Sequence, residues 1–166
     1  MNNRGFSLTE LIVVIALISI MLAVATLNFN DWQKKYNIEG QVKEMLGDLT
    51  DVRTRAIATK QQHRVILNPT SYAFRRYSSE FDVNGTEVFS KNLKYSVQQL
   101  KSDGTYAAFT NTILSFDDRG YTNDWLTIAV GVGVGSPAYN CLGVSTARVN
   151  MGKINETLSP KKCEYQ

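Results

Sequence analysis

Apolar residues near the start of the chain form one long run. From Leu11 to Leu27 only Ser19 and Thr26 are polar. As a helix this run would extend about 26 Å, which is slightly less than the ~30 Å hydrocarbon thickness of a bilayer. Apolar residues just before the run can lengthen it. The pattern therefore predicts that residues 6–27 form the membrane-spanning half of a helix.

The next segment instead repeats apolar residues at steps of four and three. They are Ile38, Val42, Met45, Leu49, Val52 and Ala56. This spacing places apolar side chains on one face of a helix, and charged residues occupy the positions between them. Gly40 and Gly47 each weaken a helix by about 1 kcal/mol relative to alanine, but no proline interrupts residues 6–62. We therefore expect residues 28–62 to form the amphipathic half of the same long helix.

After residue 62 the chain changes to short apolar runs separated by turn residues. Turns at Asn68-Pro69-Thr70, Asn84-Gly85 and Asp103-Gly104 each predict a hairpin, and Asn-Gly suits a type I′ turn. The expected strands are 63–67, 71–77, 81–83, 86–88, 95–100, 105–109, 112–116, 126–132 and 142–149. The predicted fold class is α+β, in which the long helix packs on an antiparallel β-sheet body formed by residues 63–166.

The two cysteines of the chain, Cys141 and Cys163, enclose a loop rich in turn and polar residues. No further Cys or His pair stands at zinc-binding spacing, so a disulfide is favoured over a metal site. A structural disulfide persists in an oxidising compartment, and we therefore expect the body to lie outside the cytoplasm. The sequence suggests neither a metal ion nor a cofactor.

Glu10 is an acidic residue directly before the apolar run. A charge at the centre of a spanning helix costs about 2.5–3.5 kcal/mol, so this carboxylate is expected either to have a partner or to lie near the membrane interface. A cleaved secretory signal peptide, with Arg4 as its basic residue and a cleavage site at 23–25, is the alternative. The acid, the length of the run and the helical pattern that follows it all favour an uncleaved helix.

The stretch from Arg4 to Leu11, RGFSLTEL, resembles the type III signal of type IV pilins and type II secretion pseudopilins. The resemblance implies cleavage between Gly5 and Phe6 by a prepilin peptidase, followed by N-methylation of Phe6. It also implies that Glu10 pairs with the N-terminal ammonium of a neighbouring subunit during filament assembly. Other pilins and the inner membrane are thus the expected partners, with the body in the periplasm and then on a filament or the cell surface.

Two positions depart from the pattern of that family. Many members have a glycine where this chain has Ser19 and a proline where it has Leu27, so we expect a straight helix here. In the second half, residues 113–120 and 141–149 resemble the H-type pseudopilins and related minor pilins. This resemblance implies a non-catalytic minor subunit that helps to prime assembly, and a major structural pilin is an alternative.

Catalytic sites find little support in the sequence. His63 stands beside Arg64 without a carboxylate or cysteine at catalytic spacing, so a structural or surface role is expected. The glycines of residues 131–135 lack the Lys-Ser/Thr of a phosphate loop, which predicts a strand end or loop. The adjacent Asp117 and Asp118 would point to opposite faces of a strand, and we expect a turn there.

DNA uptake is the second alternative function. Some minor pilins of this branch bind DNA through basic residues near the C-terminus, and the candidate contacts here are Arg148, Lys153, Lys161 and Lys162. Residues 147–150 lack the Gly-Arg-x-Arg pattern of those members, and nearby glutamates offset the lysines. With a formal net charge of only +3, few phosphates would be neutralised, so nucleic acid is the less favoured partner.

Overall fold

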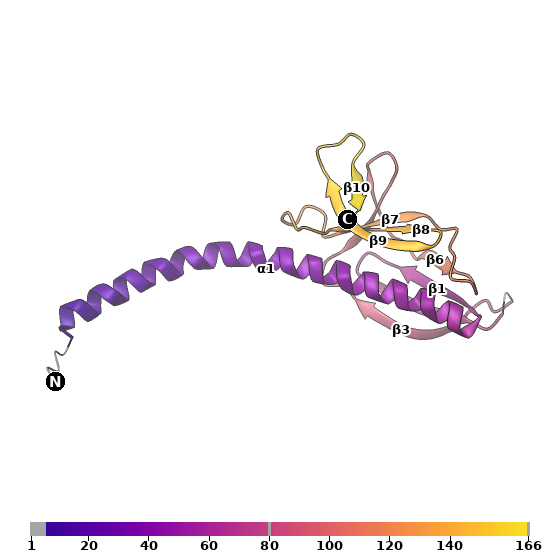
Figure 1. The fold of residues 1–166 in the computed structure, drawn as a ribbon, viewed down its shortest axis with the longest axis horizontal. Coiled ribbons are helices and arrows are strands. Elements are labelled where there is room, and N and C mark those ends of the chain that lie inside the picture. Colours follow the sequence, from indigo (N-terminus) through magenta and orange to yellow (C-terminus); the bar gives the residue numbers. More distant parts are fainter. Residues whose placement is uncertain (1–5, 80, 166) are drawn as a thin grey trace. The chain divides into compact units, whose positions relative to one another are not determined.

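The structure is a computed structural model that describes residues 6–79 and 81–165, apart from the side chains of residues 24–28. One helix, α1 (Leu8–Thr59), precedes all the strands (Figure 1). The strands are β1 (Gln62–Leu67), β2 (Ser71–Tyr77), β3 (Thr86–Asn92), β4 (Val97–Leu100), β5 (Tyr106–Ala108), β6 (Thr112–Phe116), β7 (Leu126–Val130), β8 (Cys141–Ser145), β9 (Arg148–Asn155) and β10 (Lys162–Tyr165). The predicted α+β class is confirmed.

Packing divides the chain into two compact units, residues 1–34 and residues 35–166. The first unit contains the start of α1, and the second contains the rest of the helix and all the described strands. The second unit is called the body below.

The end of α1 lies three residues before the predicted residue 62. Thr59 is its last residue, because Lys60 adopts a left-handed backbone conformation with φ of 54° that stops the helical hydrogen-bond pattern. The chain then enters β1 at Gln62, one residue earlier than predicted.

The apolar face predicted for the second half of α1 is confirmed. All six residues of the repeat are at most 2% exposed, and they belong to the main core cluster together with residues of both sheets. Full burial of a Val, Leu, Ile or Met side chain stabilises the folded state by about 1.5–3 kcal/mol. Gly40 and Gly47 lie on the exposed side of α1, where an added Cβ would meet nothing within 4 Å.

The first sheet has four strands in the order β3-β2-β1-β6, and all its neighbours are antiparallel. The hairpin predicted around residues 68–70 is present as β1 and β2. In the register, Val65 lies opposite Phe74 on one side and Leu114 on the other. These three side chains are at most 1% exposed and form part of the core that α1 covers.

The second sheet has six strands in the order β10-β9-β8-β7-β4-β5, again antiparallel throughout. Residues of one parity, such as Ile128 and Leu142, join the main core, whereas Ala129 and Cys141 lie in a second, smaller cluster. Because alternate side chains of a strand point to opposite faces, this sheet buries residues on both sides. The face that bears Ala129 and Cys141 is called the outer face below.

Two sequence predictions within the sheets are wrong. Residues 81–83 form no strand and the Asn84-Gly85 hairpin does not exist, because the Asp82 carboxylate accepts hydrogen bonds from the Ser78 and Gly85 amides and holds the segment as a loop. The sequence also predicts a single strand over 142–149. These residues instead contain most of β8, a turn at 146–147 and the start of β9, and β8 and β9 form a hairpin. The hairpin predicted at Asp103-Gly104 is confirmed as β4 and β5.

Candidate functional site

The N-terminal signal leads directly into the first turn of α1. The Ser7 carbonyl accepts a hydrogen bond from the Leu11 amide at 3.2 Å, which makes Ser7 the N-cap of the helix. Its hydroxyl lies 2.8 Å from the Thr9 hydroxyl. Phe6 precedes this cap and is 84% exposed, whereas the other half of the predicted cleavage site, Gly5, lies outside the described residues. The exposed Phe6 is thus the first described residue ahead of the helix.

Glu10 occupies the third position of the helix, so that Ser7 and Glu10 form the Ser-x-x-Glu pattern of a capping box. The amide groups of the first turn leave partial positive charge at this end of a helix. A carboxylate in this turn is therefore stabilised by the helix itself, and the exposed Glu10 side chain is available to a further cation.

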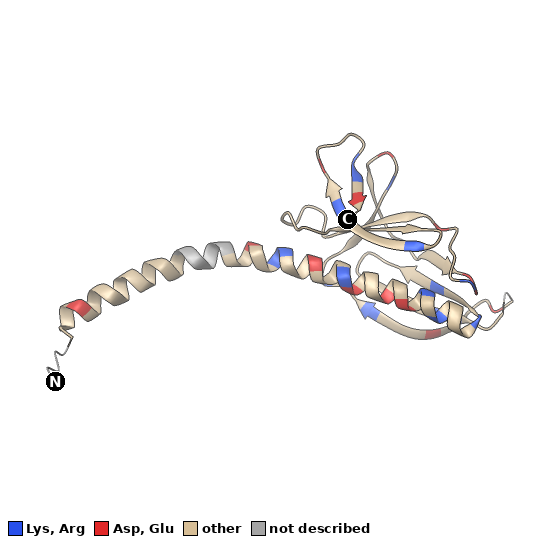
Figure 2. Cartoon of the chain, in the orientation of Figure 1, with Lys and Arg blue, Asp and Glu red and all other residues tan. Residues whose placement is uncertain are grey.

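The side chains that follow Glu10 present an apolar surface on every side of the helix. The large apolar residues from Leu11 to Leu22 are between 45% and 73% exposed. Figure 2 shows one acidic position near the start of α1 and no further charged residue until Asp31 among the described residues. A helix that is apolar all round is typical of one surrounded by other apolar groups.

Within the described part of the chain, no helix combines the length and the apolar character that are required to cross a membrane.

In the body, Lys91 of β3 joins the helix to the first sheet. Its ammonium lies 2.8 Å from the Glu44 carboxylate and 2.7 Å from the Asp48 carboxylate, and Asp48 also accepts a hydrogen bond from the Tyr72 hydroxyl at 2.6 Å. The hydrogen bond to Asp48, followed by that to Glu44, raises the pKa of Lys91. Burial, followed by the bond to Asp48, raises the pKa of Tyr72. These groups satisfy one another, so the cluster fixes the position of residues 35–59 on the sheet.

Gln41 makes a second polar connection from α1. Its amide nitrogen donates to the Tyr95 carbonyl at 2.8 Å, and its amide oxygen accepts from the Tyr95 amide at 2.9 Å. Gln41 is only 7% exposed, so this two-way pair satisfies backbone groups that burial would otherwise leave without partners. Neither this connection nor the Lys91 cluster is apparent from the sequence, because Gln41 and Tyr95 are 54 positions apart and Asp48 and Lys91 are 43 positions apart.

The residues weighed as catalytic candidates have structural positions. His63 is 2% exposed in β1, with its Nδ1 atom 3.0 Å from the Gln61 carbonyl. The Asp117 carboxylate accepts bonds from the Arg119 and Tyr121 amides and closes a turn, as predicted. Residues 131–135 form a loop after β7. Among the described residues, no group of three or more His, Cys, Asp or Glu side chains lies together as metal ligands would.

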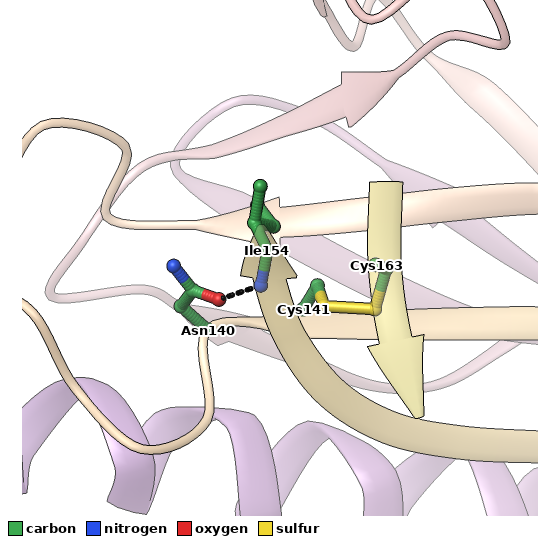
Figure 3. The surroundings of a disulfide bond; sticks show 4 residues. All are labelled: Asn140, Cys141, Ile154 and Cys163. Atoms are coloured by element: carbon green, nitrogen blue, oxygen red, sulfur yellow. Dashed lines mark hydrogen bonds between the residues drawn. A yellow bond between two sulfur atoms is a disulfide. The ribbon is translucent and has the colours of Figure 1, made fainter. Parts of the chain in front are cut away.

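Cys141 and Cys163 form a disulfide that joins β8 to β10 across the intervening β9 (Figure 3). Their Cα atoms are 6.1 Å apart. Gly152 of β9 lies beneath this crossing, and a Cβ there would collide with the backbone of Glu164. Beside the disulfide, the Asn140 side chain accepts a hydrogen bond from the Ile154 amide at 2.7 Å. The disulfide thus fastens the last strand over the outer face of the second sheet.

The basic residues near the C-terminus do not form one continuous cluster. Lys153 and Lys161 line a pocket of about 690 Å³ beside Glu156 and Glu164, whereas Arg148 is not part of it. Lys161 lies 2.6 Å from the Glu156 carboxylate, and this bond lowers the pKa of Glu156. Carboxylates therefore offset the positive charge at this place, as expected from the sequence.

The comparisons with known proteins bear on the N-terminal segment. Residues 1–26 match the sequence model of the prokaryotic N-terminal methylation motif. No curated protein and no solved structure matches the chain. The matched motif implies processing by a prepilin peptidase and assembly with other pilins. The chain therefore carries a type IV pilin-like prepilin signal, which indicates a pilin-like or pseudopilin protein.

Proposed function

We propose that the protein is a non-catalytic minor pilin or pseudopilin that helps to prime assembly of a type IV pilus or a type II secretion pseudopilus. The observation that carries this proposal is the methylation motif of residues 1–26, in which Glu10 lies in the first turn of an apolar, exposed helix. In this proposal residues 1–5 are removed, Phe6 is methylated and residues 6–27 anchor the chain in the inner membrane. The body then lies in the periplasm until assembly moves it into the filament.

Pairing between subunits explains why Glu10 and Phe6 lie so close together in the sequence. Cleavage after Gly5 creates an ammonium group on Phe6, four residues before Glu10 in the sequence. Each charge is costly in an apolar environment alone, but a carboxylate and an ammonium from two subunits neutralise each other at close range. Neutralisation of this kind favours the stagger between helices at which the two groups meet.

The body supplies the part that distinguishes one subunit from another. Its first sheet is fixed to residues 35–59 of the helix by the Lys91 cluster, and Gln41 holds the segment between β3 and β4 against the same part of the helix. The resemblance of residues 113–120 and 141–149 to the H-type branch supports a minor subunit over a shaft-forming one. Quantitative mass spectrometry of sheared filaments tests this: a small fraction of this chain is expected, and its predominance would contradict a minor role.

The assembly proposal is tested with Glu10→Ala and with Asp31→Ala as its matched control. Asp31 is an exposed acid of the same helix that pairs with Lys34 at 3.4 Å. The Glu10 variant is expected to fractionate with membranes, to keep the folded body and to be lost from filaments. The Asp31 variant should assemble normally. Filaments that contain the Glu10 variant at the normal level would show that the carboxylate does not guide assembly.

DNA reception is the weaker candidate function because the cations lie beside carboxylates. Lys153 is the cross-strand partner of Glu164, and Lys161 is bonded to Glu156. Arg148→Ala combined with Lys153→Ala should leave both filaments and DNA uptake unchanged. Loss of uptake with normal filaments would reverse this ranking.

A further inference from the structure

The outer face of the second sheet contains a groove that the assembly role does not use. It measures about 950 Å³ and lies between the β4–β5 turn, β10 and the first residues of β7. We call it the outer groove. Its lining residues are Gln99, Leu100, Lys101, Ser102, Asp103, Trp125, Leu126, Thr127, Val144, Ser145, Pro160, Lys161, Lys162, Cys163 and Tyr165.

Two aromatic rings in the outer groove are exposed but held in place. Trp125 is 74% exposed, and its indole nitrogen donates a hydrogen bond to the Thr146 hydroxyl at 3.0 Å. Tyr165 is 52% exposed and lies over Gly143, where an added Cβ would collide with its ring. The disulfide at Cys163 holds β10, and with it Tyr165, against the sheet. The groove therefore offers flat apolar surfaces whose orientation is set before any ligand arrives.

The charge of the outer groove is positive. Lys101, Lys161 and Lys162 line it, and Asp103 is the acidic residue among the lining side chains. The Asp103 carboxylate accepts bonds from the Thr105 hydroxyl and amide, which lower its pKa. The charge of Lys101 contributes to this lowering of the Asp103 pKa, although Lys101 and Lys162 form no close ion pair among the described residues, whereas Lys161 is bonded to Glu156. An anionic ligand would thus meet an excess of lysine.

The remaining lining groups are small and polar. Ser102, Thr127 and Ser145 supply hydroxyl groups to this lining. Such a combination matches a sugar chain, because a sugar ring has an apolar face of C–H groups that can stack on an indole and hydroxyl groups around its edge. Carboxylates on the sugar chain would pair with the lysines of the groove.

We propose that the outer groove binds an acidic oligosaccharide, with one sugar ring stacked on Trp125 and carboxylates facing Lys101 and Lys162. A single-stranded nucleic acid also combines flat rings with negative charge, but it carries a phosphate at every nucleotide and is bound in grooves with more cations along the backbone. The hydroxyl-rich lining and the small number of lysines favour the saccharide.

The test uses the full chain in detergent with Trp32→Phe, which leaves Trp125 as the single tryptophan. The probes are a galacturonic acid hexamer, a neutral glucose hexamer of equal length and a 20-residue oligothymidylate. Saturable change of Trp125 fluorescence with the acidic hexamer is expected, with affinity for the neutral hexamer at least about tenfold weaker. Stronger binding of the oligothymidylate, or no saturation with the acidic hexamer, would overturn the proposal.

Variants separate binding from folding. Trp125→Ala, measured by calorimetry, and Lys101→Ala combined with Lys162→Ala should each weaken binding of the acidic hexamer at least about tenfold. Lys94→Ala is the matched control because it is an exposed lysine outside the groove. Thr146→Val should weaken binding and Thr146→Ser should preserve it, since the residue 146 hydroxyl accepts the hydrogen bond that orients the indole. Unchanged affinity in Trp125→Ala would contradict the proposal.

Discussion

The disulfide between Cys141 and Cys163 is expected to contribute strongly to the stability of the body. The two cysteines are 22 residues apart, and Cys141 is fully buried in the smaller core cluster. In the chain-entropy model, cross-linking a loop of that length lowers the conformational entropy of the unfolded chain, and this raises the free energy of unfolding by about 3 kcal/mol. For a body of this size, loss of this contribution corresponds to a fall in Tm of roughly 10 °C. Cys141→Ala combined with Cys163→Ala should show this fall.

Thermal unfolding followed by circular dichroism, with and without a reducing agent, measures the effect. Reduction should lower the Tm of the parent protein and leave that of the double variant unchanged. Trypsin provides a local readout, because release of β10 exposes the backbone at Lys161 and Lys162. A double variant that melts within about 2 °C of the parent and resists trypsin equally would refute the entropy argument.

Three further predictions follow from the helix and its contacts. Gly40→Ala and Gly47→Ala should each raise the free energy of unfolding by about 0.5–1 kcal/mol, because both positions are exposed and have space for a Cβ; a lower Tm would contradict this. In the folded protein the pKa values of Tyr72 and Lys91 are raised above their ordinary values of 10.0 and 10.5. The stability that these two groups contribute is therefore complete below the ordinary values and is lost as the pH rises through the folded-state values. Tyr72→Phe should therefore reduce the alkaline loss of stability, and an equal loss in both proteins would exclude the tyrosine as its source. Mass spectrometry of the protein from its native host should find a methylated Phe6 at the N-terminus, whereas a start after residue 25 would indicate an ordinary signal peptide.

The parts of the fold that depend on local spacing could be predicted from the sequence. The steps of four and three from Ile38 to Ala56 place one face of α1 in the core, and that face is buried as expected. The turn at Asp103-Gly104 formed, but that at Asn84-Gly85 did not, although both have a suitable glycine. The difference lies in Asp82, whose side chain takes backbone hydrogen bonds that a ladder would otherwise use.

Contacts between distant parts of the chain could not be predicted. β10 has a polar sequence without alternation, and its place depends on the disulfide and on the glycines beneath it, Gly143 and Gly152. The Lys91 cluster likewise joins charges that are individually ordinary surface residues. By contrast, the signal around Phe6 and Glu10 is contained in a few adjacent residues, and for that reason the sequence alone could reveal it.

Because one face of α1 completes the core of both sheets, the helix determines where a fragment for crystallisation has to begin. A fragment that starts at Lys35 keeps the whole buried face, from Ile38 onward, and omits the exposed apolar segment before it. A fragment that starts at β1 would leave Val65, Phe74 and their neighbours facing solvent along a strip of sheet. Such a strip invites aggregation during expression. Purification of the body should therefore succeed with the first boundary and fail with the second.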